Sequence, residues 1–407
     1  MEDREILEKY RNEVSGELRN ILSYWSVQCL DEKNGGFIGA IDNNNVHHWD
    51  APKGVVLNSR ILWTFAAAYN NGENEADLLM ASRAYEYIRD HFVDRQYGGV
   101  YWSVTYNGKP LDTKKQVYAQ SFCMYGLSEY YLATQNTEAL DLAIDIYRQT
   151  VRHGYEPAFG GYIEAFTREW GAIADLRLSE KDANERKTMN THLHVIEGFA
   201  NLYRAWPDVE LKEKIVGLLD IFEKHIIDSG TFHLKLFFND QWQEQGRVIS
   251  YGHDIEAAWL LLECAEIAGE ERWIGKMKER AVQITSAAAE GLDADGGMWH
   301  EYDVMQDHLL KQKHWWPQAE AMVGFFNAWE LTQEPQLLQQ SIKSWKFIKQ
   351  YLIDVGHGEW YWGVNADYSK MKGEDKAGMW KCPYHNGRAC MEIMRRIDFL
   401  NVMIKII

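Results

Sequence analysis

Apolar residues recur along the chain with the period of an amphipathic α-helix. In the segments 59–69, 76–92 and 139–151 they fall three and four residues apart, so that they share one helical face. The chain has only 7 prolines, the residue that most strongly interrupts helices, and few long β-branched runs. The pattern therefore predicts a mainly helical protein with small β pieces.

A glycine-plus-aromatic signature interrupts this helical pattern six times. Its copies begin at Gly35, Gly98, Gly160, Gly230, Gly296 and Gly358, and the fourth copy is degenerate. Successive copies lie roughly 60 to 70 residues apart, which is longer than the period of short solenoids. Six units of this length fill the chain, so we expect residues 1–407 to form a single domain.

Each unit reads as a helix, a short turn or hairpin, and a second helix, which predicts about twelve helices in total. Stacked in a line, such pairs would form an α-solenoid. An inner ring of six helices within an outer ring of six would form a closed barrel. Turns of uniform chemistry at the same end of each pair favour the closed form. We therefore expect an all-α protein with an (α/α)6 barrel and short Gly/aromatic hairpins at one end.

Charge and composition exclude several classes of partner. The chain has 43 Lys and Arg against 60 Asp and Glu, a net charge of −17, and no basic run, so we expect no nucleic-acid partner. It has no stretch of about 18 apolar residues, so we expect no membrane contact. The N-terminus has no basic-then-apolar segment, and the 5 cysteines show no C-x-x-C spacing. We expect a cytoplasmic protein with reduced thiols, and a monomer or at most a weak dimer.

Candidate chemistry gathers where the second helix of each unit should begin. In a closed barrel these starts share one mouth, so their polar side chains should face a common cleft. In chain order the candidates are Arg60, Tyr118, Gln120, Asn190, His192, His194, His253, Asp254, Glu256, His314, Trp315, Trp316, Gln318, Glu320, Trp380, Tyr384 and His385. With 17 Trp, 22 Tyr and 15 Phe, the chain has ample aromatic surface to line such a cleft.

Most histidines have a structural interpretation, because a lone histidine beside an apolar run is seldom a catalyst. This interpretation applies to His47, His48, His91, His153, His225, His233, His308 and His357. His194, His253 and His385 fall at what we take to be equivalent positions of three units. Their coincidence favours a shared site.

Three chemistries compete for this cleft. His253 and Glu256 have the i, i+3 spacing of metal ligands in helical bundles, but the spacing has no second copy. Glu256 and Glu320 would supply the two carboxylates of a glycosidase and leave three histidines without a role. Removing a proton next to a carbonyl needs a base that titrates near neutral pH, as imidazole does. Several imidazoles in an aromatic cleft therefore favour epimerisation or aldose–ketose isomerisation of a sugar.

Four segments together resemble the cellobiose 2-epimerase branch of the N-acylglucosamine 2-epimerase superfamily. They are residues 190–194, 250–256, 314–320 and 380–388. The resemblance covers essentially the whole chain. It implies an (α/α)6 barrel, no metal or organic cofactor, and conversion of the reducing-end glucose of cellobiose into mannose or the reverse. Lactose and other β-1,4-linked oligosaccharides are further expected substrates.

The resemblance also implies roles for individual residues. His253 and His385 would exchange the C2 proton as base and acid, and His194 would assist ring opening. The residues implied to hydrogen-bond the sugar and its enediolate are Arg60, Tyr118, Asn190 and Glu256. Those implied to hold the disaccharide are Trp316, Trp380 and Glu320, with Asp182 as a further contact.

Other interpretations stay open at this point. The charged segment 176–189 is typical of a solvated linker, and the alternative is a lid that excludes water from the enediolate. A mannose 2-epimerase or mannose–fructose isomerase would use the same scaffold. Trp316 and Trp380 favour a disaccharide, because a second sugar ring needs an aromatic platform. A glycoside hydrolase in an α/α barrel is more remote, and a binding module would need no convergent histidines.

Overall fold

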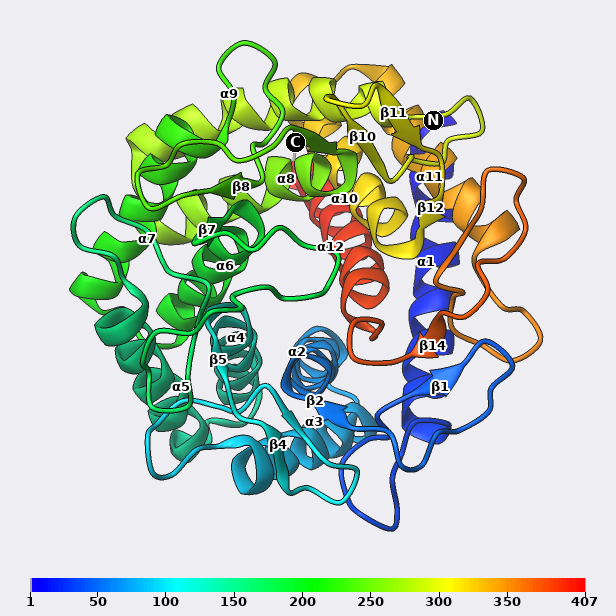
Figure 1. Cartoon of the computed structure of the whole chain (residues 1–407). Coiled ribbons are helices and arrows are strands. Elements are labelled where there is room, and N and C mark those ends of the chain that lie inside the picture. The colour runs from blue at the N-terminus through cyan, green and yellow to red at the C-terminus, as the bar shows by residue number, and fades with distance from the viewer. Residues whose placement is uncertain (1, 407) are drawn as a thin grey trace.

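The chain forms two concentric rings of α-helices in a computed structural model that describes residues 2–406, with side chains from 4 to 402. Figure 1 looks down the barrel from one end. The inner helices are α2 (Val55–Gly72), α4 (Val117–Thr134), α6 (Met189–Ala205), α8 (Tyr251–Ala268), α10 (Trp315–Thr332) and α12 (Tyr384–Ile406). The outer helices are α1 (Glu2–Val27), α3 (Glu75–Tyr87), α5 (Thr137–Gln149), α7 (Val209–Ile221), α9 (Glu271–Ala288) and α11 (Pro335–Tyr351).

Contacts between helices show that the ring is closed. Each inner helix packs against the next one along the chain, and α12 returns to pack against α2. Each outer helix from α3 onward lies against the inner helix that precedes it, and α1 lies against α12. The first and last elements of the chain therefore complete the same ring. The predicted (α/α)6 barrel is confirmed.

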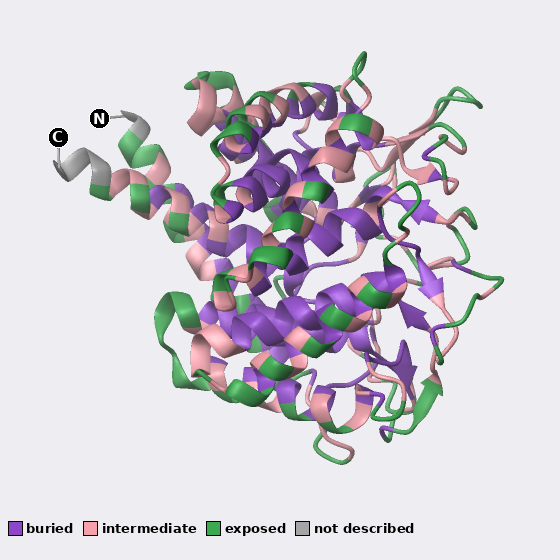
Figure 2. Ribbon diagram, turned by 90° about the vertical axis from the view of Figure 1, so that its left-hand side faces the viewer, coloured by how far each residue is buried: buried purple, intermediate pink, exposed green. Residues whose placement is uncertain are grey.

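Burial explains why the two rings differ in sequence. Inner helices such as α8 and α10 are apolar on all sides, because neighbours surround them. Outer helices such as α5 bury one face and expose the other (Figure 2). Asn74, Asn136 and Asp208 cap the outer helices α3, α5 and α7 by accepting a hydrogen bond from a backbone N–H of the first turn. None of the described helices combines the length and apolarity that a bilayer crossing requires.

Short antiparallel strands form a second closed ring at the mouth of the barrel. Within the described chain these are β1 (Ile41–Asp42), β2 (Lys53–Gly54), β3 (Ser103–Val104), β4 (Pro110–Asp112), β5 (Lys115–Gln116), β6 (Ala165–Phe166), β7 (Lys187–Thr188), β8 (Phe237–Phe238), β9 (Val248–Ser250), β10 (Glu301–Asp303), β11 (His308–Leu310), β12 (Lys313–His314), β13 (Gly363–Val364) and β14 (Asp375–Ala377). They form six small sheets, which are β2–β3–β4, β5–β6, β7–β8, β9–β10–β11, β12–β13 and β14–β1. The last pair joins the final unit to the first. Figure 2 shows these strands at one end and both termini at the other.

The predicted Gly/aromatic hairpins are present at this end, and their geometry explains the signature. In the second copy, Gly98 and Gly99 have φ values of 75° and 67°, where a side chain is strained. A Cβ added to Gly99 would lie 2.6 Å from Oε1 of Gln120. That amide instead bonds the turn, accepting from Val100 N at 2.8 Å and donating to Val100 O at 2.9 Å. In the degenerate copy, Phe232 adopts the left-handed conformation with a φ of 64°.

A buried lysine ties most of these turns to the next inner helix. The lysine lies two residues before the helix in the first, second and fifth units, and it reaches the acidic residue that opens the turn. The pairs are Lys53–Asp31 at 2.8 Å, Lys115–Asp94 at 2.9 Å, Lys313–Asp293 at 2.8 Å and, in the last unit, Lys376–Asp354 at 2.6 Å. These contacts hold the helix starts in place, and with them the side chains that enter the mouth.

Candidate active site

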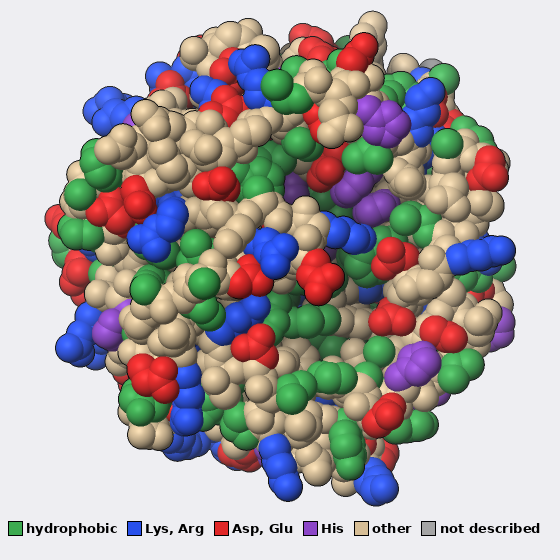
Figure 3. Space-filling view, viewed as in Figure 1, with side chains coloured by type: hydrophobic (Ala, Val, Ile, Leu, Met, Phe, Trp, Pro, Cys, Tyr) green, Lys and Arg blue, Asp and Glu red, His purple; other side chains and the backbone are tan. Residues whose placement is uncertain are grey.

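Three predicted catalytic histidines enter the mouth from the first two turns of three inner helices. His194 is on α6, His253 on α8 and His385 on α12. The rings of His253 and His385 both lie against the indole of Trp316, with ring centroids 4.7 and 5.7 Å from it. The space-filling view in Figure 3 shows histidines gathered beside the hollow of this face.

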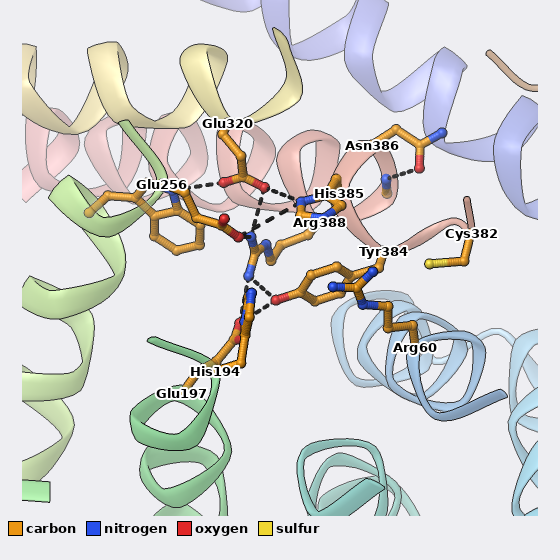
Figure 4. Close-up of polar contacts among 12 residues, drawn as sticks. Arg60, His194, Glu197, Glu256, Glu320, Cys382, Tyr384, His385, Asn386 and Arg388 are labelled. Atoms are coloured by element: carbon orange, nitrogen blue, oxygen red, sulfur yellow. Dashed lines mark hydrogen bonds and ion pairs between the residues drawn. The ribbon is translucent and has the colours of Figure 1, made fainter. Parts of the chain in front are cut away.

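Two of these rings are oriented by buried carboxylates. Nδ1 of His385 lies 2.7 Å from Oε1 of Glu320, and Nδ1 of His194 lies 2.8 Å from Oε2 of Glu197 (Figure 4). A carboxylate accepts, so Nδ1 carries the proton in both rings. Nε2 of each ring is therefore a lone-pair acceptor, with no hydrogen-bond partner among the described residues.

Burial keeps the imidazoles neutral. It lowers the pKa of His253 to about 3, helped by repulsion from His194, His300 and His385. It lowers the pKa of His385 to about 3 as well, even though the hydrogen bond that His385 donates to Glu320 opposes this shift. Nδ1 of His253 shares a hydrogen bond of 2.8 Å with Oγ of Ser250. The neutral form has a free lone pair that can accept a proton, but the lowered pKa makes these imidazoles weaker bases than the sequence predicted.

A buried arginine, Arg388 on α12, joins the carboxylates of the site. Its Nη2 lies 2.7 Å from both Glu256 Oε1 and Glu320 Oε1, and its Nη1 lies 2.5 Å from Glu197 Oε1. Burial and the neighbouring charge of Glu320 raise the pKa of Glu256 to about 8. Burial also opposes ionisation of Glu320, but Arg388 and His385 outweigh it and lower the pKa of Glu320 to about 2. One of the two carboxyl groups is thus neutral and the other ionised.

A second cation lies on the α2 side of the site. Nη2 of Arg60 donates to the hydroxyl of Tyr118 at 2.7 Å, and its guanidinium carbon lies 4.1 Å from the ring centroid of Phe122. The Tyr118 ring is 5.1 Å from that of His194 and 6.0 Å from that of Trp380. This contact chain places Arg60, Tyr118 and Trp380 beside the histidines. Arg60 is therefore a positive charge held close to the bases.

Two predicted binding residues are placed less directly. Asn190, the second residue of α6, is half-buried, and its Oδ1 has no partner among the described residues. Asp182 lies on the segment between β6 and β7, which crosses the face of the barrel in Figure 1. Its Oδ2 accepts from the backbone N and Oγ of Ser179 at 2.8 and 2.9 Å. Among the described residues, Asp182 makes no hydrogen bond to the histidine cluster.

Comparison with known proteins agrees with this architecture. A family model described as N-acylglucosamine 2-epimerase (GlcNAc 2-epimerase) matches residues 36–389. The chain belongs to the N-acylglucosamine 2-epimerase family.

Relatives of this family cover nearly the whole chain. Cellobiose 2-epimerase of Bacteroides fragilis is 48% identical over 385 residues, which are 94% of this chain and 98% of the relative. Cellobiose 2-epimerase of Dictyoglomus turgidum is 38% identical and covers 96% and 100%. The solved structure of cellobiose 2-epimerase from Bacillus thermoamylovorans has a TM-score of 0.90 and 40% identity, covering 96% and 100%. Both the fold and its length are thus shared within the family.

A metal ion is a poor fit to the acidic part of this epimerase-family site. One ligand atom each from Glu256, Glu320 and His385 lies within 4.8 Å of the others. However, the Arg388 guanidinium already bonds both carboxylates, so a cation is in place there. His253 and Glu256, the i, i+3 pair that resembled metal ligands, each bond a different residue. His253 bonds Ser250 and Glu256 bonds Arg388.

Two expectations about the helix starts need correction. The three histidines are not at equivalent positions, since His194 is the sixth residue of α6, His253 the third of α8 and His385 the second of α12. The sixth position is instead shared by Arg60, His194, Glu256 and Glu320. Fourth-position residues are not site residues, because they bond the backbone N–H of the turn. They are Gln120, His192, Asp254 and Gln318.

Sequence reasoning missed two central residues of the site. Glu197 and Arg388 are buried and bond each other, yet each lies three residues beyond the last candidate on its helix, His194 on α6 and His385 on α12. Arg388 stands at the end of the motif 380–388, three residues after His385. The spacing of three residues between His385 and Arg388 was the available signal, because residues three apart lie on the same helix face and Arg388 should therefore lie beside the catalytic histidine.

Proposed function

We propose that this chain is a cellobiose 2-epimerase that interconverts glucose and mannose at the reducing end of cellobiose. The observation that carries the proposal is the pair of neutral imidazoles, His253 and His385, held against one indole in the mouth of the barrel. Relatives that match nearly the whole chain are named cellobiose 2-epimerase, which supports the proposal. The proposal treats residues 1–407 as one catalytic domain.

The reaction begins with ring opening, because the closed hemiacetal has no acidic proton on C2. His194 is proposed to assist transfer of the O1 proton to the ring oxygen. In the open aldehyde, a neutral imidazole, His253 or His385, accepts the C2 proton and leaves a cis-enediolate. Negative charge then develops on O1, and the Arg60 guanidinium stabilises it.

Epimerisation is completed when a proton returns to C2 from the opposite face. The second imidazole takes up a proton from solvent, favoured by the negative charge of the enediolate, and delivers it to C2 after rotation about the C2–C3 bond brings the other face towards it. The first imidazole releases the proton it accepted back to solvent. One proton is removed from C2 and one is returned, so the sugar gains and loses no electrons overall. This chemistry calls for no metal or organic cofactor, because imidazoles carry both transfers.

A disaccharide is the proposed substrate because the site offers two aromatic platforms. Trp316 and Trp380 are each half-buried at the mouth, so both indoles keep surface for a sugar ring. Tyr118, Asn190 and Glu256 are proposed to hydrogen-bond the reacting sugar, and Glu320 and Asp182 complete the binding set. Lactose and other β-1,4-linked oligosaccharides are proposed as further substrates. A cytoplasmic location is part of the proposal and is supported by five free, buried cysteines.

Incubation with cellobiose in deuterated water tests the proposal. We expect deuterium at C2 of both the recovered cellobiose and the mannose-containing product, with the glycosidic bond intact. Free glucose would instead identify a hydrolase, and a ketose product would identify an isomerase. Activity on mannose alone would favour the monosaccharide enzyme on the same scaffold.

Histidine variants assign the two faces. His253→Ala and His385→Ala should each abolish net epimerisation. Exchange of the C2 proton in only one epimer would show which face each imidazole serves. His357→Ala is the matched control, because the His357 side chain is 66% exposed and lies outside the cluster. Full activity of both catalytic-site variants would refute the mechanism.

A further inference from the structure

We infer that Arg388 is the positioning residue of this reaction, because one guanidinium holds both carboxylates that orient the imidazoles of His194 and His385. Arg388 is 2% exposed and lies between His385 and His194 in Figure 4. Nothing in its contacts reaches a base directly; it acts through Glu197 and Glu320. The inference rests on the proposed epimerase function.

The geometry of the two arms is parallel. On one side, Glu320 Oε1 accepts from both His385 Nδ1 and Arg388 Nη2, each at 2.7 Å. On the other side, Glu197 accepts from His194 through Oε2 and from Arg388 through Oε1. In each arm the carboxylate fixes the tautomer of its histidine by accepting the Nδ1 proton, and it is itself held by the same arginine. Moving Arg388 would therefore disturb both imidazoles together.

Neighbouring contacts prevent Arg388 from turning away. The hydroxyl of Tyr384 donates to Glu197 and also accepts from Nη1 of Arg388. The guanidinium carbon lies 4.2 Å from the Tyr384 ring centroid and 4.8 Å from that of Trp259. Nε1 of Trp259 donates to the remaining oxygen of Glu320 at 3.0 Å. The planar fork of arginine fits this arrangement, and the point charge of lysine would not.

Arg388 also sets the electrical environment of the bases. It balances part of a buried group of three carboxyl groups. Burial does most to lower the pKa of His194 and His385, and the positive charge of Arg388 lowers both further. The charged and titratable groups around this centre are Arg60 on α2, Tyr118 on α4, His194 and Glu197 on α6, His253 and Glu256 on α8, Glu320 on α10, and Tyr384 and His385 on α12. Loss of the cation should therefore raise the pKa of the imidazole base.

The test measures cellobiose epimerisation by Arg388→Met and Arg388→Lys across pH. For Arg388→Met we expect kcat to fall at least 30-fold, KM to change less than threefold, and the acidic limb of kcat/KM to move up by at least one pH unit. Arg388→Lys keeps the charge, so its acidic limb should stay near that of the unmodified enzyme. Its kcat should still fall about tenfold, because one ammonium cannot hold both arms.

Arg396 supplies the matched control on the same helix. It is also largely buried, and it bonds Glu392, Glu330 and Asn327 away from the histidines. Arg396→Met should lower the unfolding midpoint and leave the acidic limb unchanged, as any merely structural arginine would. Unaltered kcat or an unmoved acidic limb in Arg388→Met would overturn the inference.

Two further outcomes keep the result decisive. If Arg388→Met does not fold, Arg388→Lys decides the question: kcat within twofold of the unmodified enzyme overturns the inference, and a tenfold loss at constant KM supports it. Failure of the unmodified enzyme to epimerise cellobiose would refute the proposed function itself. The two failures are therefore distinct.

Discussion

Glu256 and Glu320 show how two identical side chains acquire different protonation states. Both are buried, and both bond Nη2 of Arg388 at 2.7 Å. Only Glu320 also accepts from an imidazole, and it is the one whose pKa falls to about 2. Glu256 keeps its proton because burial and its ionised neighbour raise its pKa to about 8. The site therefore has a neutral carboxyl group able to donate to a sugar oxygen.

These shifts predict the pH dependence of the reaction. The imidazole that accepts the C2 proton must be neutral, and the pKa values of His253 and His385 are lowered to about 3, so acid should have little effect down to pH 5. Glu256 must be protonated, and its pKa of about 8 means that this form is lost as the pH rises through 8. We expect kcat/KM to vary less than threefold from pH 5 to 7 and to fall above pH 8. A rate profile with initial velocities at low substrate checks this.

One variant separates the acidic limb of the pH profile from the alkaline limb. Glu256→Gln cannot ionise, so its residual activity should show no fall near pH 8 while the acidic behaviour stays unchanged. An alkaline limb that persists in this variant would mean that a group other than Glu256 titrates there.

At the residue scale, the sequence identified the side chains that line the cleft better than the buried side chains that hold them in position. His253 and His385 stood out because imidazoles at helix starts are unusual. Glu197 and Arg388 did not, because a charged residue within a helix usually faces solvent. Their burial depends on the convergence of α6 and α12, whose nearest ends are 179 positions apart in the sequence, and the local pattern does not encode this relation.

At the element scale, the repeated signature predicted turns correctly but not what anchors them. The fourth residue of four inner helices bonds the turn, and this made Gln120 and His192 resemble site residues. Spacing along a helix tells which residues share a face, but not whether that face meets a ligand or a neighbouring hairpin. The structure identifies the partner of each side chain: Gln120 accepts from Val100 N and His192 from Tyr162 N, so both side chains bond a hairpin.

The segment 176–189 is an element whose role the structure sharpens. Its base is fixed, since the Gln116 amide donates to the carbonyl oxygens of Leu176 and Arg177 at 3.2 and 2.8 Å. Its other end is held near β8, because Nε of Arg186 donates to Oδ1 of Asp240 at 3.0 Å. Between these anchors the tip stands over the face of the barrel, where charged side chains lie across the hollow in Figure 3. This placement favours a lid over a plain linker.

Removing the tip tests the lid. Deleting residues 179–182 should lower kcat/KM at least tenfold, because water reaches the enediolate and the Asp182 contact is lost. The measurement is steady-state epimerisation of cellobiose, with Asp175→Ala as the control at the exposed foot of the segment. The single variant Asp182→Ala distinguishes loss of the Asp182 contact from loss of water exclusion by the lid. Equal losses in both variants would assign the effect to Asp182, and unchanged turnover and affinity would remove the lid.

At the scale of the whole molecule, closure of the barrel depends on contacts between its first and last units. Glu359, in the last Gly turn, accepts from Nε1 of Trp25 on α1 at 2.7 Å. It also accepts from Nζ of Lys381 and Nδ2 of Asn386, both at 2.6 Å. Asn386 adjoins His385, so the joint between the two ends of the chain directly supports a catalytic histidine. Sequence predicted closure from the six units, but it could not identify this pair.

The buried Glu359–Lys381 pair should therefore be the most costly single contact of the joint to break. Both side chains are fully buried, so Glu359→Gln or Lys381→Met leaves an uncompensated charge and should destabilise the fold by about 3–5 kcal/mol. Replacing both residues removes both charges, and we expect the double variant to lose clearly less than the sum of the single losses. Denaturant midpoints of the four proteins check this, with Arg177→Ala at an exposed ion pair as the control. Strictly additive losses would show that the two charges do not depend on each other, and that the ring is held closed by apolar packing of α1 against α12 alone.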